Sequence, residues 1–257
     1  MPDTWHKEYA GLPAFAHLRP WLDRLPNAAW PDLATLNGFA ARQDLRNAGG
    51  LPLRFTPQTS PCGQLEYELG IHASGNVPSR ERNWHDLFNA LIWLTFPATK
   101  AALNATHQTA LLPGRNRMPV SDAATLFDES GLLLIGEDER LIELLAARRW
   151  RQALVDRRPL WTQVGAYVIG HAVLEKLARP WPGITAKCLF LKLPPDTPLE
   201  TVDAALALRW QATAIASPDQ LFPLPVLGIP GWWPANQDER FYDDTRYFRP
   251  PRPSGAP

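Results

Sequence analysis

The segment NWHDLFNALIWLTF, residues 83–96, constrains the fold of this chain more than any other because it is apolar on nearly every side. A helix without a broad polar face packs inside a protein or inside a membrane. The longest largely apolar run, Leu87 to Phe96, is shorter than the roughly 18–20 residues that a bilayer span needs. We therefore predict that residues 83–96 form a buried helix in a globular protein.

Apolar periodicity and the placement of proline and glycine predict the other elements. Helices are expected over Asp32–Arg46, Ala98–Leu111, 137–156 and 161–178, and from the capping box Thr197-Pro198-Leu199-Glu200 to about Trp210. Alternating apolar residues predict a strand over Gln64–His72, a second strand is expected over Ile184–Leu193, and Asp128-Glu129-Ser130-Gly131 is typical of a hairpin turn. The pattern predicts an α+β fold, mainly helical with six or seven helices, and a small mixed sheet.

The C-terminal region differs in composition from the rest of the chain. The sequence holds 27 prolines and 11 tryptophans, and proline is about twice as frequent as the usual ~5%. We expect one globular domain over residues 1–220 and an extended arm over 221–257 packed on it, with the last eight or so residues disordered. The arm's aromatic side chains either fill grooves of the domain or form a lid or a partner-binding strip.

Charge and cysteine content exclude several classes of protein. Lys+Arg and Asp+Glu both number 26, so a general electrostatic attraction to nucleic acid or to an acidic membrane is not expected. The arginines between Arg148 and Arg158 complement a helix dipole, which leaves nucleic-acid binding as the weakest hypothesis. Cys62 and Cys188 form no disulfide framework, and the first residues do not look like a signal peptide, so a cytoplasmic location is expected.

Polar residues at helical spacing interrupt three of the predicted apolar helices. His85 and Asn89 are one turn apart in the buried helix, and Asp86 beside them needs a cation, a metal or several donors because a buried unpaired carboxylate is costly. The next helix carries Lys100, Asn104 and His107 along one stripe, and the helix over 161–178 carries His171 and Glu175 one turn apart.

If these faces converge, they form a polar pocket in an apolar core. Imidazole and carboxylate groups bind Zn, Mn or Fe and act as acids and bases near neutral pH. We therefore assign catalytic roles to His85, Asp86, His107, His171 and Glu175, metal ligation to His85, Asp86, His107 and His171, and substrate binding to Arg80, Arg82, Asn89, Lys100 and Asn104. The turn at Asp128-Glu129 would add a carboxylate, and the cations would hold an anion such as a phosphoester.

A structural explanation of the same residues remains open. Asn83 is a good helix N-cap, which makes Asp86 a favourable acid in the first turn. His107 near a helix C-terminus is electrostatically favourable, and His171 with Glu175 could tie a helix to a loop. The sequence contains no HExxH, Walker, GxGxxG or GxSxG motif, so the hydrolases and nucleotide-binding proteins defined by those motifs are excluded.

Three stretches resemble a known family. They are NVPSRERNWHDLFNALIWLTFPATKAALNATH, GHAVLEK and PVLGIPGWWPANQDERFYDDTRYFRP. Together they are similar to the bacterial family called domain of unknown function 3025, over roughly residues 20–250. This resemblance implies no activity, cofactor or catalytic residue. Two hypotheses therefore stand: a metal-assisted hydrolase of an unidentified small molecule, or a non-catalytic binding or scaffold protein whose arm engages a protein partner or a second copy.

Overall fold

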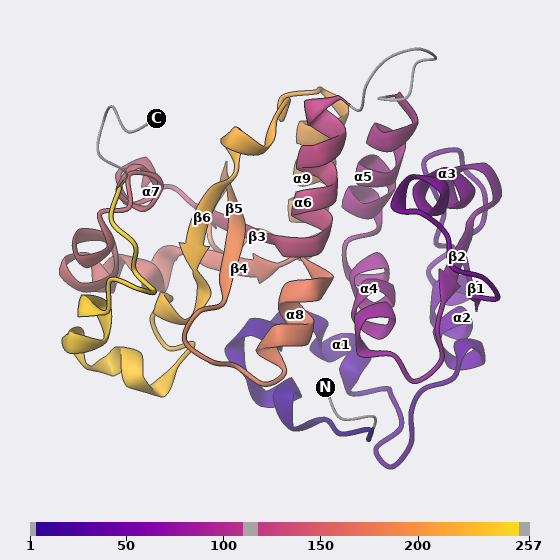
Figure 1. The fold of residues 1–257 in the computed structure, drawn as a ribbon, viewed down its shortest axis with the longest axis horizontal. Helices are drawn as coiled ribbons and strands as arrows, with labels where there is room; N and C mark the ends of the chain where they lie inside the picture. The colour runs from indigo at the N-terminus through magenta and orange to yellow at the C-terminus, as the bar shows by residue number, and fades with distance from the viewer. Residues whose placement is uncertain (1–3, 110–117, 252–257) are drawn as a thin grey trace.

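A four-stranded mixed sheet with the order β4-β3-β5-β6 runs through the middle of the molecule (Figure 1). β3 (Gly131–Gly136) and β5 (Thr185–Lys192) are parallel, while β4 (Gly165–Val168) and β6 (Phe222–Pro225) pair antiparallel to them at the two edges. Every residue of β3 is buried, as expected for a central strand covered on both faces. Figure 1 shows α5, α6 and α9 on one side of this sheet, and α7 with the C-terminal arm on the other.

We describe residues 4–109 and 118–251 from a computed structural model. This part of the chain is mainly helical with a small mixed sheet, and its buried apolar residues form one continuous core. The predicted α+β fold class is therefore confirmed. No helix within the described ranges has both the length and the apolar character that crossing a membrane requires.

The predicted buried helix is α4 (Trp84–Thr95). Asn83 caps it, since its side-chain oxygen accepts a hydrogen bond from the backbone N–H of Asp86. α5 (Pro97–Thr109) follows directly, and its N-terminus is capped from another helix: the Asp203 carboxylate of α9 (Leu199–Gln211) accepts from the backbone N–H of both Ala98 and Thr99. This cap fixes the helix that carries Lys100 and Asn104.

The remaining elements surround this centre. The longer ones are α2 (Leu33–Arg42), α3 (Gln64–Ser74), α6 (Pro119–Ser130), α7 (Glu139–Ala146) and α8 (His171–Leu177), with the short α1 (Arg19–Leu22) and a parallel pair of strands, β1 (Arg54–Pro57) and β2 (Asn76–Ser79). Single 3₁₀ or π turns cover Glu8–Gly11, Pro13–Leu18, Gln152–Asp156, Arg158–Gln163, Pro218–Gln220, Val226–Gly228, Pro234–Gln237 and Glu239–Asp243. The predicted strand at 184–193 and helix to Trp210 are confirmed as β5 and α9.

The predicted strand over Gln64–His72 is wrong, because this segment is the helix α3. Its fully buried residues are Glu68 and Ile71, three positions apart, so the buried face follows the helical period and not the alternation. Gly75, in a left-handed conformation, ends the helix. Of the other alternating apolar residues, Tyr67 and Leu69 are only partly buried, and Leu65 is exposed.

Three further boundaries differ from the sequence-based expectation. The predicted hairpin at Asp128–Gly131 is instead the end of α6 followed directly by β3. The predicted helix over 161–178 is a 3₁₀ turn, the strand β4 and the short helix α8. The predicted helix over 137–156 ends at Ala146, and Arg148, in a left-handed conformation, separates it from the turn at Gln152–Asp156.

The C-terminal arm packs against its own chain as far as the structure describes it. Tyr247 is buried, and its hydroxyl donates to the carbonyl of Ile184 next to β5 and accepts from the N–H of Leu227. Trp150 donates its indole N–H to the carbonyl of Arg249. The bonds to Ile184 and Trp150 tie the arm to the chain that precedes it. The last residues, for which disorder is expected, and the last two of the predicted helix Ala98–Leu111 lie outside the described residues.

Candidate metal centre

A close backbone contact between two glycines brings the elements of the site together. The N–H groups of Ile169 and Gly170 both donate to the carbonyl of Gly131, and a Cβ on Gly170 would lie 2.4 Å from the Gly131 nitrogen. The backbone can approach this closely only without a side chain. The contact places the start of α8 against the end of α6, and α4 packs beside α8 (Figure 1).

Two histidines from different helices face each other at this junction. His85, in the first turn of α4, and His171, the first residue of α8, have their Nε2 atoms 3.0 Å apart. The His171 side chain is buried, while the His85 side chain is 31% exposed. The structure thus brings together two of the three histidines to which the sequence assigned a role.

Glu129, the penultimate residue of α6, completes a triangle with these imidazoles. Its Oε1 atom lies 3.5 Å from Nε2 of His171 and 3.9 Å from Nε2 of His85. Within the described residues, these three form a group whose side chains can share one metal ion. Because a circle through three atoms with these separations has a radius of about 2.0 Å, an ion at its centre would lie at the bond length that Zn²⁺ forms with imidazole and carboxylate ligands.

Each imidazole has a carboxylate near its other ring nitrogen. Glu175 Oε2 lies 3.4 Å from Nδ1 of His85, and Asp128 Oδ2 lies 3.7 Å from Nδ1 of His171. Asp128 is itself held by Lys100, whose ammonium donates to Oδ1. In metal sites the second nitrogen of a ligating histidine usually faces a carboxylate, which orients the ring and leaves Nε2 for the metal.

The protonation states suit a cation-binding site. Burial and the neighbouring His171 lower the pKa of His85, so its imidazole is neutral and offers a lone pair at neutral pH. Burial alone would raise the pKa of Glu129. The hydrogen bond and charge interaction with His171, together with the nearby His85, outweigh burial and bring the pKa of Glu129 below its ordinary value. The Glu129 carboxylate is therefore ionised at neutral pH.

Glu68 of α3 adds a carboxyl group that the sequence-based assignment missed. It is buried, and Nδ2 of Asn104 donates to its side-chain Oε2 at 2.7 Å and to its backbone carbonyl at 2.8 Å. Burial and the nearby Asp128 raise the pKa of Glu68 to about 7. A carboxyl group with this pKa can accept and release a proton near neutral pH.

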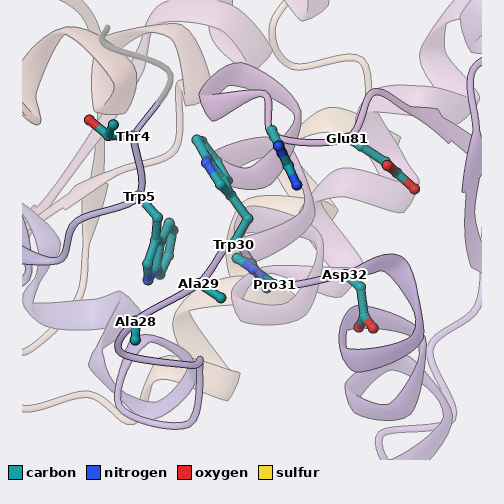
Figure 2. Close-up of a pocket in the computed structure, with 9 residues that line it drawn as sticks. Thr4, Trp5, Ala28, Ala29, Trp30, Pro31, Asp32 and Glu81 are labelled. Atoms are coloured by element: carbon teal, nitrogen blue, oxygen red, sulfur yellow. The ribbon is translucent and has the colours of Figure 1, made fainter.

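The cations assigned to anion binding are already paired or lie elsewhere. Arg80 forms a two-pronged ion pair with Asp86, and Lys100 is buried against Asp128. Arg82 lines a different hollow, of about 550 Å³. Figure 2 shows Trp5 and Trp30 side by side in that second hollow, with Glu81 and Asp32 on the opposite side.

The other predicted site residues are spread around the triangle. Asn89 donates to the hydroxyl of Tyr67 at 3.0 Å and lines the same cavity as His85. His107 forms a hydrogen bond with Ser121 through Nδ1, and Asp86 pairs with Arg80, so neither belongs to the three-residue cluster. Glu175 lies behind His85 and orients it, with no place in the triangle itself.

The three residues of the triangle border a cavity of about 350 Å³. Its wall includes the two histidines, Glu129, Glu68, Asn89 and Cys62.

The family described as "Protein of unknown function (DUF3025)" matches the chain over residues 53–252. The chain belongs to this family. Comparison with curated proteins and with solved structures found no match.

The DUF3025 match confirms the resemblance seen in the sequence and covers the whole candidate site, from Glu68 of α3 to Glu175 of α8. Glu68 escaped prediction because its segment was taken for a strand, in which it would point away from the apolar side. Glu129 was noted as an additional carboxylate at a turn and was not assigned as a ligand. A helical assignment for residues 64–74 would have shown Glu68 on the face of Ile71.

Proposed function

We propose that His85, His171 and Glu129 bind a divalent metal ion such as Zn²⁺, Mn²⁺ or Fe²⁺, and that this DUF3025 protein is a metal-assisted hydrolase. The observation that carries the proposal is the triangle of two imidazole nitrogens and one carboxylate oxygen around a point about 2.0 Å from each. Three protein ligands beside a cavity leave a coordination position for water or substrate, as in catalytic zinc sites.

The side chains around the triangle support this chemistry. A bound divalent ion lowers the pKa of its water toward ~7 and polarises a substrate oxygen. Glu68 lines the same cavity, and with a pKa of about 7 it is the residue suited to take a proton from the attacking water and return it to the leaving group. Glu175 and Asp128 lie 3.4 Å and 3.7 Å from the Nδ1 atoms of His85 and His171, so each could accept a hydrogen bond from its ring once Nε2 binds the ion.

The phosphoester substrate suggested by the sequence gains less support than the metal site. Holding a phosphate requires cationic side chains that are available in the pocket. Arg80 and Lys100 are each engaged by a carboxylate, and Arg82 lines the other hollow. We therefore keep hydrolysis as the reaction class and do not base the proposal on a phosphoester.

The binding or scaffold alternative depends on the aromatic arm, and the arm's packing does not favour it. Tyr242, Tyr247 and Phe248 are buried against the arm's own chain. Their rings are therefore unavailable to a partner unless the arm detaches.

Metal content tests the proposal directly. We expect the purified protein, dialysed against Zn²⁺ and then against buffer, to retain about one Zn²⁺ per chain by elemental analysis, since such a site has three protein ligands. His85→Ala and Glu129→Gln should each lower Zn²⁺ affinity severely while circular dichroism shows an unchanged fold, because both side chains are partly exposed. His72→Ala is the matched control, since His72 is a partly buried histidine on α3. Equal Zn²⁺ retention by wild type and His85→Ala would refute the proposal.

A further inference from the structure

We infer that the cavity beside the metal triangle takes a substrate that presents hydrogen-bond donors, namely an amide or amine, in preference to a phosphate-like anion. This inference rests on the proposed metal site and specifies its substrate class. It follows from two independent features of the cavity: the balance of charge around it and a buried acceptor without a partner.

The charge balance disfavours an anion even when the metal is bound. Arg80 and Asp86 neutralise each other, as do Lys100 and Asp128. The two charges of a divalent ion are then offset by Glu129 in the triangle and by Glu175 behind His85. Glu68 adds a further carboxyl that is partly ionised at neutral pH. An entering phosphate dianion would thus meet a site with no surplus positive charge, whereas a neutral or cationic ligand would not be repelled.

The unpartnered acceptor belongs to Asn89. This residue is 6% exposed, lines the cavity, and directs its Nδ2 to the hydroxyl of Tyr67. Its Oδ1 atom is buried and accepts no hydrogen bond from the described residues. A buried acceptor of this kind is costly unless a donor reaches it, so a ligand that places a donor beside Asn89 gains a hydrogen bond that the protein alone does not supply. An amide or ammonium N–H supplies that donor, but a phosphate ion, which mainly accepts hydrogen bonds, does not.

The chain also offers neutral groups for a donor-bearing ligand. Tyr67 OH lies next to Asn89, and Gln58 and Gln64 line the same cavity. Among the residues that line this cavity, Arg80 is the cation, and it is held by two hydrogen bonds to the Asp86 carboxylate. Freeing Arg80 is therefore the smallest change that would turn the cavity toward anions.

Two small ligands of opposite character test the inference on the intact chain. The protein is loaded with Co²⁺, whose visible spectrum reports its coordination, and titrated at pH 7.5 with glycinamide or with inorganic phosphate. We expect glycinamide to shift the Co²⁺ spectrum at a concentration lower by about tenfold or more, because like-charge juxtaposition penalises the anion. Asn89→Leu should weaken glycinamide binding by about fivefold, the usual effect of losing one hydrogen bond, with Co²⁺ affinity and phosphate binding unchanged.

Asp86→Asn is the complementary variant. It releases Arg80 from its ion pair and should strengthen phosphate binding by about tenfold, whereas glycinamide, which is largely cationic at pH 7.5, should bind no more tightly than to the wild type. The inference is overturned if phosphate binds as tightly as glycinamide to the wild type, if neither ligand perturbs the bound Co²⁺, or if Asn89→Leu changes nothing. If the wild type does not bind Co²⁺ at all, the proposed metal site itself has failed, and that result is seen before either ligand is added.

Discussion

Removing Lys100 tests how the buried part of the site is held together. Its side chain is 4% exposed, its ammonium donates to Asp128, and the same ammonium lies over the ring of Trp93, 5.3 Å from the ring centroid. Lys100→Met keeps the aliphatic stem and removes the charge. Asp128 then keeps the longer 3.7 Å contact with His171. Breaking a buried pair by removing one partner costs about 3–5 kcal/mol, so we expect a loss of this size in the free energy of unfolding near pH 8.

The pH dependence of that loss identifies its cause. Burial alone would raise the pKa of Asp128, and Lys100 with His171 brings it below its ordinary value. Without Lys100, burial dominates and the pKa of Asp128 rises above its value in the unfolded chain. Above the unfolded-state pKa of about 4, the ionised Asp128 then lowers the free energy of unfolding of the variant. This loss grows until pH exceeds the raised folded-state pKa, and it disappears as pH falls back through that range. The deficit of Lys100→Met should therefore be largest at pH 8 and smaller at pH 5.

Urea unfolding followed by tryptophan fluorescence at the two pH values measures these differences. Lys192→Met is the matched control, because Lys192 and Glu139 form an exposed ion pair whose loss should cost within about 1 kcal/mol. The double variant Lys100→Met/Asp128→Asn removes the unpaired charge and should recover most of the stability. If Lys100→Met is as stable as its control, or if its deficit is the same at pH 5 and pH 8, the electrostatic explanation of this network is wrong.

Three further predictions concern other parts of the fold. In the same urea assay, the free energy of unfolding of the wild type should fall relative to that of Glu68→Gln by up to roughly 3 kcal/mol between pH 5 and pH 8. The reason is that the pKa of Glu68 is raised to about 7, so its ionisation destabilises the folded state as pH rises. An equal pH profile for both proteins would contradict this. Asp203→Ala should cost about 2–3 kcal/mol by leaving two N–H groups at the start of α5 without an acceptor, and more than the exposed cap variant Asp32→Ala. Tyr247→Phe should cost about 1–3 kcal/mol, since its hydroxyl makes two buried hydrogen bonds; a thermally unchanged protein would show that the arm is not anchored there.

The central helices could be predicted because their signals are local. Residues 83–96 are apolar on nearly every side, Asn83 is a favourable cap, and Pro97 both ends one helix and begins the next. The segment Thr197–Glu200 likewise locates the start of α9, but the predicted capping box does not form, because the Thr197 hydroxyl donates to the carbonyl of Pro194. His85 and His171 were noticed for the same reason, since a polar residue in an apolar helix is visible in the sequence alone.

The rest of the site depends on contacts that the sequence does not reveal. Glu129 reaches His171 because α6 ends where the backbone of Gly131 meets that of Gly170, a long-range approach without a local signal. Residues 64–72 alternate like a strand, yet packing against α5 buries Glu68 and Ile71 on a helical face. His107 follows the helical stripe of Lys100 and Asn104, but it pairs with Ser121 of α6 instead of joining the other histidines.

The distances and exposures within the site distinguish the proposed metal ligands from the buried pairs around them. The buried pairs, Lys100 with Asp128 and Asn104 with Glu68, have short hydrogen bonds that a structural role explains. The contacts of Glu129 are different: its carboxylate lies 3.9 Å from the partly exposed His85 and 3.5 Å from the buried His171, which is too long for strong hydrogen bonds. The contact with the partly exposed His85 should stabilise the fold by only about 0–1 kcal/mol. The two imidazole nitrogens and the Glu129 oxygen are, however, near the spacing that three ligands of one shared metal ion require. His85→Ala should therefore remove metal binding with little loss of stability, whereas a purely structural network predicts the reverse.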